Sequence, residues 1–208
     1  MNAEVSQATK AQEVSTVRLS IPAQALEAAR LCMGKRDVRY YLNGIRINDK
    51  RISGTNGHVL YDHAFNAPIV LDDSLPFDRE IILMPQSAVP ASASTAIIEL
   101  FHDFALIKYY KRNYGSPGDF IKADFAHLID GKFPDVDRIL GPLKGEPEPT
   151  KVIGFKSEYL ALAQKIFGRF SRFGALKMVM HGERSAAHFE HDDVDTGKHY
   201  FVVMPLRL

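Results

Sequence analysis

The densest group of metal-ligating side chains in the sequence is HFEHDD, from His188 to Asp193. It contains two imidazoles and three carboxylates, and we expect His181 and His199 to lie near it on adjacent strands. These ligand types suit zinc and other first-row metals, so a metal site is one hypothesis. The polar ends of β-hairpins collect the same residue types more often. We therefore predict no bound metal and no cofactor.

No catalytic motif accompanies this group. The sequence contains no glycine-rich phosphate loop, no nucleophile elbow and no pair of cysteines. Its single cysteine, Cys32, cannot form an internal disulfide. The sequence therefore predicts a protein that is not an enzyme.

Basic side chains form a second chemical pattern. Lys165, Arg169 and Arg172 follow one another at spacings of four and three, which places them on one face of a helix. Such a stripe can follow DNA phosphates without reading bases, although a solvated helix face is an equally common meaning. The run KYYKRNYG from Lys108 could stack single-stranded bases, but an alternating strand before a glycine turn is the more frequent interpretation.

The C-terminal segment YFVVMPLRL, from Tyr200 to Leu208, stays apolar to the last residue. Chain ends are usually poorly ordered unless something holds them in place. Side chains such as Val202, Met204 and Leu206 must therefore be buried or form part of a binding surface.

The composition is that of an ordinary globular protein. Of the 208 residues, 46% are apolar and 25% are charged, and the formal charge of +1 excludes a histone-like polycation. No apolar run is long enough to span a bilayer. Residues 1–15 lack the basic and apolar regions of a secretion signal, and we expect them to form a mobile polar arm. We predict a soluble, cytoplasmic protein.

The elements that position these side chains follow a repeated order. The first unit should contain a strand at 17–19, then a helix capped by Ser20, with Pro22 in its first turn and Gly34 at its end. Three short antiparallel strands should then follow between Val38 and about Phe65, separated by turns rich in Asn, Asp and Gly.

Two further units show the same order. The second should consist of a strand at 80–85, a helix between Gln86 and Glu99, and strands at 100–110 and 120–123. The third should consist of the strand VIGF at 152–155, a helix from Ser157 to about Phe173, and strands near 178–181, 187–190 and 199–205. Between them lies the proline-rich GPLKGEPEPTK at 141–151, where we place the domain boundary. The pattern predicts an α+β fold of three β-α-β-β-β units.

Four segments resemble the bacterial sliding clamp, the beta subunit of DNA polymerase III, in motif order and spacing. They are DVRYYLNGI from Asp37, TNGHVL from Thr55, GKFPDVDRIL from Gly131 and the C-terminal segment. The resemblance implies the sliding-clamp fold, with helices on one side and antiparallel sheets on the other. Residues 16–144 would form a complete central domain, 145–151 a linker, and 152–208 half of the last domain.

The resemblance also implies a pocket for the short peptides of partner proteins. The positions that match its lining are Leu42, Thr55, Gly57, His58, Leu60, Pro134, Arg138, Ile139, Tyr159, Val202, Met204, Pro205, Leu206 and Arg207. Aliphatic side chains and a deformable methionine suit a groove for apolar anchors. The chain has Asn56 and Val59 where the family usually has Asp and Arg, which leaves the range of partners open.

Contact with the backbone of double-stranded DNA is the second implied role. The candidate residues are Arg30, Lys35, Arg36, Arg39, Tyr40, Tyr41, Lys165, Arg169 and Arg172. A half domain would leave an apolar flank at Ile166, Phe170 and Phe173, so we predict a dimer through residues 150–208, with a tetrameric ring as a larger assembly.

Two functional hypotheses follow. The first is a processivity factor that binds a polymerase or other replication proteins through the peptide pocket and encircles DNA as an oligomer. The alternative is a regulator that does not encircle DNA and competes for the same peptides.

Overall fold

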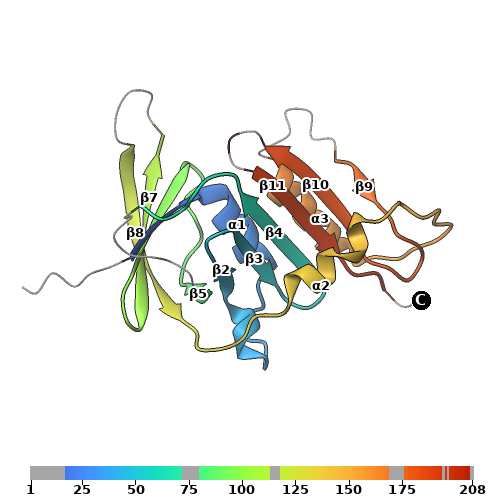
Figure 1. The fold of residues 1–208 in the computed structure, drawn as a ribbon, viewed down its shortest axis with the longest axis horizontal. Helices are drawn as coiled ribbons and strands as arrows, with labels where there is room; N and C mark the ends of the chain where they lie inside the picture. The colour runs from blue at the N-terminus through green and yellow to red at the C-terminus, as the bar shows by residue number, and fades with distance from the viewer. Residues whose placement is uncertain are drawn as a thin grey trace, which may run out of the picture.

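The computed structural model describes residues 17–71, 80–112, 118–168, 176–193, 195 and 197–206. Within them the chain forms one antiparallel sheet of eleven strands with helices on its faces (Figure 1). The predicted N-terminal arm lies outside the described residues. So do five residues with predicted roles: Arg169, Phe170, Arg172, Phe173 and Arg207.

The strand order is β1-β6-β7-β8-β5-β2-β3-β4-β11-β10-β9. The strands are β1 (Val17–Pro22), β2 (Ile45–Ile47), β3 (Arg51–Thr55), β4 (Val59–Phe65), β5 (Ile81–Pro85), β6 (Thr95–Leu100), β7 (Phe104–Lys111), β8 (Asp119–Leu128), β9 (Met178–Val179), β10 (Ala187–Asp193) and β11 (Gly197–Val203). The helices are α1 (Ala23–Cys32), α2 (Val136–Leu140) and α3 (Ser157–Phe167), with 3-10 turns η1 (Tyr40–Asn43) and η2 (Pro142–Lys144).

The first unit is complete, but its helix starts later than predicted. Ser20 does not cap α1, because it pairs with Ile97 inside the ladder between β1 and β6, and β1 continues to Pro22. The helix begins at Ala23, whose N–H donates to the Ser94 carbonyl at 3.0 Å. A loop carbonyl distant in sequence thus replaces the predicted side-chain cap. At the other end, Met33 rather than Gly34 is the C-terminal cap residue.

The predicted helix of the second unit is wrong. In the described structure, residues 86–94 form bends and turns, and Thr95–Leu100 is strand β6. Serine and proline disfavour a helix in this short connection. The β-branched Ile97 and Ile98 instead pair with β1 and β7 in the sheet. The rest of the unit, β5, β7 and β8, lies near the predicted positions.

The third unit joins the first through its last strand. Strand β11 pairs with β4 from Gly197↔Phe65 to Val203↔Val59. The predicted strand at 152–155 is reduced to a single bridge between Gly154 and Leu206, and α3 is described as far as Phe167. The predicted three strands of this unit are β9, β10 and β11.

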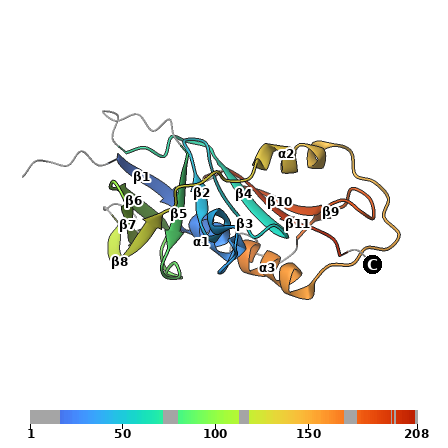
Figure 2. The same cartoon turned by 90° about the horizontal axis from the view of Figure 1, so that it is seen from below.

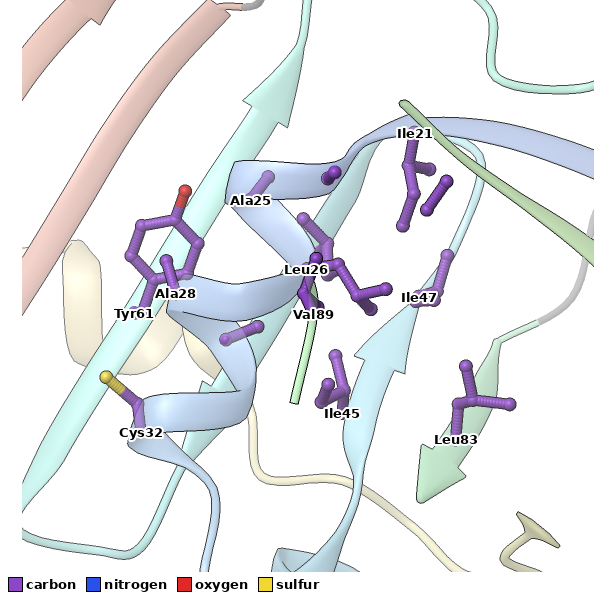
Figure 3. Packing of buried hydrophobic residues seen from close by; sticks show 14 of the residues in the cluster. Ile21, Ala25, Leu26, Ala28, Cys32, Ile45, Ile47, Tyr61, Leu83 and Val89 are labelled. Carbon is purple, nitrogen blue, oxygen red and sulfur yellow. The ribbon is translucent and has the colours of Figure 1, made fainter. Parts of the chain in front are cut away.

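Helices α1 and α3 lie side by side on one face of the sheet, and α2 lies on the other (Figure 2). Helix α1 packs its alanine and leucine face onto β2, β3 and β4, with Leu26 fully buried (Figure 3). The approach of helix and sheet is close: a Cβ on Gly54 of β3 would lie 2.0 Å from the Ala29 carbonyl oxygen. A second cluster, with Phe133, Leu140 and Val202, lies between the sheet and α2.

No helix in the described part of the chain has the length and hydropathy needed to cross a membrane. The described residues also contain no group of three or more metal-ligating side chains arranged to hold an ion. The histidines of the HFEHDD region make ring contacts instead: His181 stacks on His188, and His191 lies beside His199 and Phe167.

Candidate functional site

The turn between β3 and β4 is held by its own side chains. Asn56 Oδ1 accepts hydrogen bonds from the backbone N–H groups of His58 and Val59, at 2.9 and 3.0 Å. Thr55 Oγ1 donates to the Val59 carbonyl at 2.6 Å and accepts from Gly57 N–H. Gly57 takes a left-handed conformation with φ of 87°. An Asn side chain therefore provides the acceptor that an Asp would provide, so this departure from the family pattern preserves the turn.

The C-terminal segment lies against this turn. Met204 N–H donates to the His58 carbonyl at 2.9 Å, and Leu206 N–H donates to the Gly154 carbonyl at 2.7 Å. Val202 and Val203 are buried, whereas Met204 and Leu206 are 45% and 42% exposed. The segment is thus anchored through its strand and backbone, while the side chains of Met204 and Leu206 are partly exposed to solvent. The C-terminal segment therefore contributes to the protein surface as well as to the core.

Beside the turn and the C-terminal segment lies a pocket of about 860 Å³. Its floor comes from β4 and β11, and its walls come from η1, α2 and the linker that follows α2. The pocket therefore exists because β11 pairs with β4, which brings residues near 58 and 203 together. A cavity of this size, lined by both aliphatic and polar side chains, suits a peptide or a small ligand.

The structure brings nine of the fourteen predicted peptide-site residues into this lining. They are Leu42, Thr55, Gly57, His58, Leu60, Pro134, Ile139, Val202 and Met204. Pro205 and Leu206 line a neighbouring pocket of about 630 Å³ that shares Met204 and Arg184 with the first. Tyr159 stacks on His58, with ring centroids 5.9 Å apart, so it lies beside the lining. Arg138 is exposed on α2 and lines neither pocket.

Two residues predicted for DNA contact, Arg39 and Tyr41, also line the main pocket. Arg39 forms two hydrogen bonds with the Asp37 carboxylate and donates a third to the Asn56 carbonyl at 3.2 Å. The Arg39 guanidinium lowers the pKa of Asp37 to about 2. Val59 is an uncharged, buried side chain, so the rim lacks the cation that an Arg would bring at this position, but Arg39 brings one to the same turn.

Sequence reasoning missed the linker wall. Pro142, Leu143, Gly145, Glu146, Pro147 and Glu148 line the pocket, together with His181, Arg184, Ser185 and Ala186. The linker is held there by buried Leu143 and by the Glu148 N–H, which donates to the Met180 carbonyl at 3.1 Å. Its proline content is typical of an extended connection, and no local signal indicates these distant contacts.

A pair of buried histidines lies under this wall. The rings of His181 and His188 stack with centroids 5.3 Å apart, and both are less than 9% exposed. Burial lowers the pKa of His188. This pair belongs to the HFEHDD region, so residues considered for a metal site contribute to the structure around the pocket.

The other basic residues predicted for DNA contact lie in different surroundings. Lys35 and Arg36 are exposed after α1, and Tyr40 is 57% exposed on η1. Lys165 is exposed on α3, beside α1. Arg30 is committed to an ion pair with Glu27 at 2.7 Å. The two packed helices thus carry part of the predicted basic surface.

No family model matches the chain. A beta sliding clamp of Pseudomonas putida is 31% identical over 120 residues, which cover 55% of this chain and 30% of that protein. A beta sliding clamp of Pseudomonas aeruginosa is 28% identical over the same length. The chain therefore matches about a third of the length of these curated relatives.

Solved structures extend the likeness to nearly the whole chain. The DNA polymerase sliding clamp of Caulobacter crescentus aligns with a TM-score of 0.57 at 18% identity, covering 100% of this chain and 68% of that one. An H. pylori beta clamp aligns with a TM-score of 0.61 at 13% identity, covering 92% and 66%. These likenesses show the predicted fold class, an α+β fold of the sliding-clamp type.

Proposed function

We propose that this chain, a member of the sliding-clamp family that matches part of its relatives' length, acts as a clamp-type platform for replication proteins. It binds a short linear peptide of a polymerase or another replication factor in the pocket between β4, β11 and the linker. The face with α1 and α3 lies against the DNA backbone. In this role the protein holds a partner near DNA and catalyses no reaction itself.

The proposal rests on one observation: segments that are distant in the sequence line the same pocket. Leu42, Leu60 and Val202 come from three parts of the chain and lie in the same lining. Met204 is nearly half exposed at its rim, where a flexible thioether can adapt to an apolar anchor. Charged and polar side chains, including Arg39, His58 and Glu146, surround this apolar floor. That combination fits a peptide with one or two large aliphatic or aromatic anchors.

The second pocket supports an extended ligand. It shares Met204 and Arg184 with the main pocket and continues along Pro205 and Leu206. His58 and Tyr159 stack between the turn and the start of α3, and Lys156 lies over the Tyr159 ring at 5.4 Å. A peptide that fills the main pocket can therefore continue across Met204 toward α3. We propose that Tyr159, Pro205 and Leu206 act in this second part of the site.

The test is a calorimetric titration of the chain with a clamp-binding peptide of the Gln-Leu type. Met204→Ala should weaken binding by about 2 kcal/mol, roughly thirtyfold, because it truncates the apolar side chain that lines both pockets. Leu71→Ala is the matched control: Leu71 is 46% exposed, close to the exposure of Met204, and lines neither pocket. Unchanged affinity in Met204→Ala, or absence of binding to the unmodified chain, would remove the pocket assignment.

A further inference from the structure

Strands β1, β6, β7 and β8 turn one face toward the core and the other toward solvent. Along β7, Ala105, Ile107 and Tyr109 are fully buried, whereas the residues between them are partly exposed. Side chains alternate between the two faces of a strand, so Phe104 and Tyr110 belong to the solvent side. We call this surface, with its cross-strand neighbours, the outer face. Figure 2 shows these four strands at the end of the molecule remote from α2 and α3.

Aromatic rings gather in two pairs on the outer face. Phe104 of β7 and Phe125 of β8 lie 5.8 Å apart, and Phe101 stacks on Phe104 with ring centroids 4.6 Å apart. Tyr110 and Phe120 form the second pair, also at 5.8 Å. Phe120 and Phe125 are 58% and 60% exposed, and Phe104 is 38% exposed. Rings that are open to solvent on a sheet face can each hold a stacked nucleobase.

The sequence run KYYKRNYG contributes only alternate residues to this face. Tyr109 is fully buried, with the Lys122 ammonium 5.5 Å from its ring centroid, whereas Tyr110 is partly exposed. The ring beside Tyr110 comes from Phe120 on the next strand. The other apolar surface predicted from the sequence differs, because Ile166 of that flank is 3% exposed and packs in the core of its own chain.

A charged pair separates the two pairs of rings. Phe125 is the register partner of Leu106, four residues along β7 from Tyr110, so the ring pairs lie about 13 Å apart at about 3.3 Å per residue. Between them, Lys108 Nζ donates to the Glu99 carboxylate at 2.7 Å. Charged residues are depleted at the centre of protein–protein interfaces. Separate rings with charge between them therefore favour a nucleic acid strand over an apolar protein surface.

Cations outnumber carboxylates on the outer face. Arg18 of β1 is the register partner of Glu99, and Lys108 bonds to the same carboxylate, so Glu99 lies between two cations. In the described strands β1, β6, β7 and β8, Glu99 is the only carboxylate on this face, because Asp119 and Asp124 alternate onto the other side. This balance attracts a polyanion.

A pocket of about 530 Å³ continues the outer face beyond Tyr110. Thr95, the register partner of Tyr110, lines this pocket, and so does the exposed Arg112. A guanidinium at this position can bind a phosphate or stack on a base. Ser20 and Asp195 add a hydroxyl and a carboxylate to the lining, which can accept hydrogen bonds from the amino groups of bases.

We propose that the outer face binds single-stranded DNA, with bases stacked on the two ring pairs and phosphates beside Arg18, Lys108 and Arg112. Stacking uses the π-face that every base has, so the site tolerates any sequence. Duplex DNA cannot use it, because its bases are stacked on one another. The site goes beyond the proposed function and does not depend on the peptide pocket, since β5, β2 and β3 separate β8 from β4.

The test is fluorescence anisotropy of a labelled oligothymidylate titrated with the full chain at low salt. Phe120→Ala and Phe125→Ala should each weaken binding by at least about fivefold, because each removes the support of one stacked base. Phe125→Trp keeps a flat ring and should bind at least as tightly as the wild type. Phe125→Leu keeps apolar volume without a ring, and should bind as weakly as Phe125→Ala.

Two further variants separate phosphate contact from a general change of surface. Arg112→Gln should reduce the slope of log affinity against log salt by about 0.7, the loss of one phosphate contact to a single strand. Val38→Ala is the matched control and should retain the wild-type affinity, because Val38 is 96% exposed and lies outside the sheet. Each variant should keep the wild-type circular dichroism spectrum, and the two ring positions keep the test decisive if one variant does not fold.

Competition distinguishes stacking from binding through the DNA backbone alone. An unlabelled single strand should displace the probe, whereas a duplex of the same length should displace it far less. Equal displacement by the duplex overturns the proposal, and so does the absence of probe binding by the wild-type chain. Wild-type affinity in Phe125→Leu also overturns it, because the face would then make the purely apolar contact of a protein interface.

Discussion

Two strands of this sheet, β4 and β8, differ in how completely their edges are paired. Strand β4 is covered along its whole length by β11, and the junction buries Phe201, Val203 and His199. Strand β8 has no strand partner on its second side over residues 119–125 of the described structure, where residues 86–88 make only a few hydrogen bonds to it, and Phe120 and Phe125 are exposed. The covered edge creates the pocket, because it brings the C-terminal segment against the turn before β4. The same sheet thus combines one fully paired junction, which forms the pocket, with a second strand that is paired in part.

The largest expected difference between the two edges is in stability. Phe201→Ala should lower the free energy of unfolding by about 3–5 kcal/mol, since Phe201 is fully buried and its loss leaves a cavity. Phe125→Ala should change that free energy by less than about 0.5 kcal/mol in the monomer, since the ring is mostly exposed. Urea denaturation at submicromolar concentration measures both. Equal costs for the two substitutions would contradict the distinction between a covered and an open edge.

Acid should weaken the covered edge. Burial, and then the neighbouring His63 ring 4.1 Å away, lower the pKa of His199 to about 3 from an ordinary value of 6.5. Below pH 6.5, His199 therefore binds a proton in the unfolded chain but stays neutral in the folded chain. The contribution of His199 to stability is complete above pH 6.5 and is lost as the pH falls toward 3, by about 2 kcal/mol at pH 5.

Chemical denaturation at pH 7, 6 and 5 checks this dependence. His199→Gln should flatten the fall in stability over this range, although the substitution itself lowers stability at pH 7. The matched control is His127→Gln, at an exposed position of β8, which should retain the wild-type slope. A wild-type stability that stays constant from pH 7 to 5 would argue against the buried neutral imidazole at the junction.

Sequence reasoning predicted most strands because their boundaries depend on local chemistry. The Asn48 and Asn56 turns separate β2, β3 and β4 as expected, and β5 follows its apolar pattern. The prediction of a helix after β5 was wrong. Residues Thr95–Leu100 pair with β1 and β7, and this pairing outweighs a weak local helical pattern. Local chemistry cannot reveal such pairing between distant segments.

The candidate site was predicted through the resemblance, and only in part. Nine predicted residues line the main pocket, because the pairing of β11 with β4 brings their segments together. The linker wall could not be predicted, since Leu143 and Glu148 reach the pocket through contacts with residues far away in the chain. Arg39 was predicted for DNA, and its place in the pocket depends on the folded turn beside Asn56.

The smallest expected effect concerns DNA on the helix face. Replacing Lys165, Arg169 and Arg172 by Glu should reduce the salt slope of DNA binding by about 3, equivalent to roughly sixfold between 100 and 200 mM salt. Replacing the exposed Lys132, Lys144 and Lys151, which lie outside α1 and α3, changes the net charge equally and should have less effect. Electrophoretic retention of end-blocked DNA at several salt concentrations measures the slope. Equal losses in both triple variants would favour the regulator that does not encircle DNA.

Hydrogen exchange of the chain with and without a Gln-Leu-type peptide tests the central claim most directly. The peptide should slow exchange in the turn at 56–60, in the linker at 142–148 and in the C-terminal segment at 202–206, because all three line the two pockets. Exchange along residues 119–125 of β8 should stay unchanged. Protection confined to β8, or absent from all three pocket segments at saturating peptide, would contradict a peptide site at the covered edge.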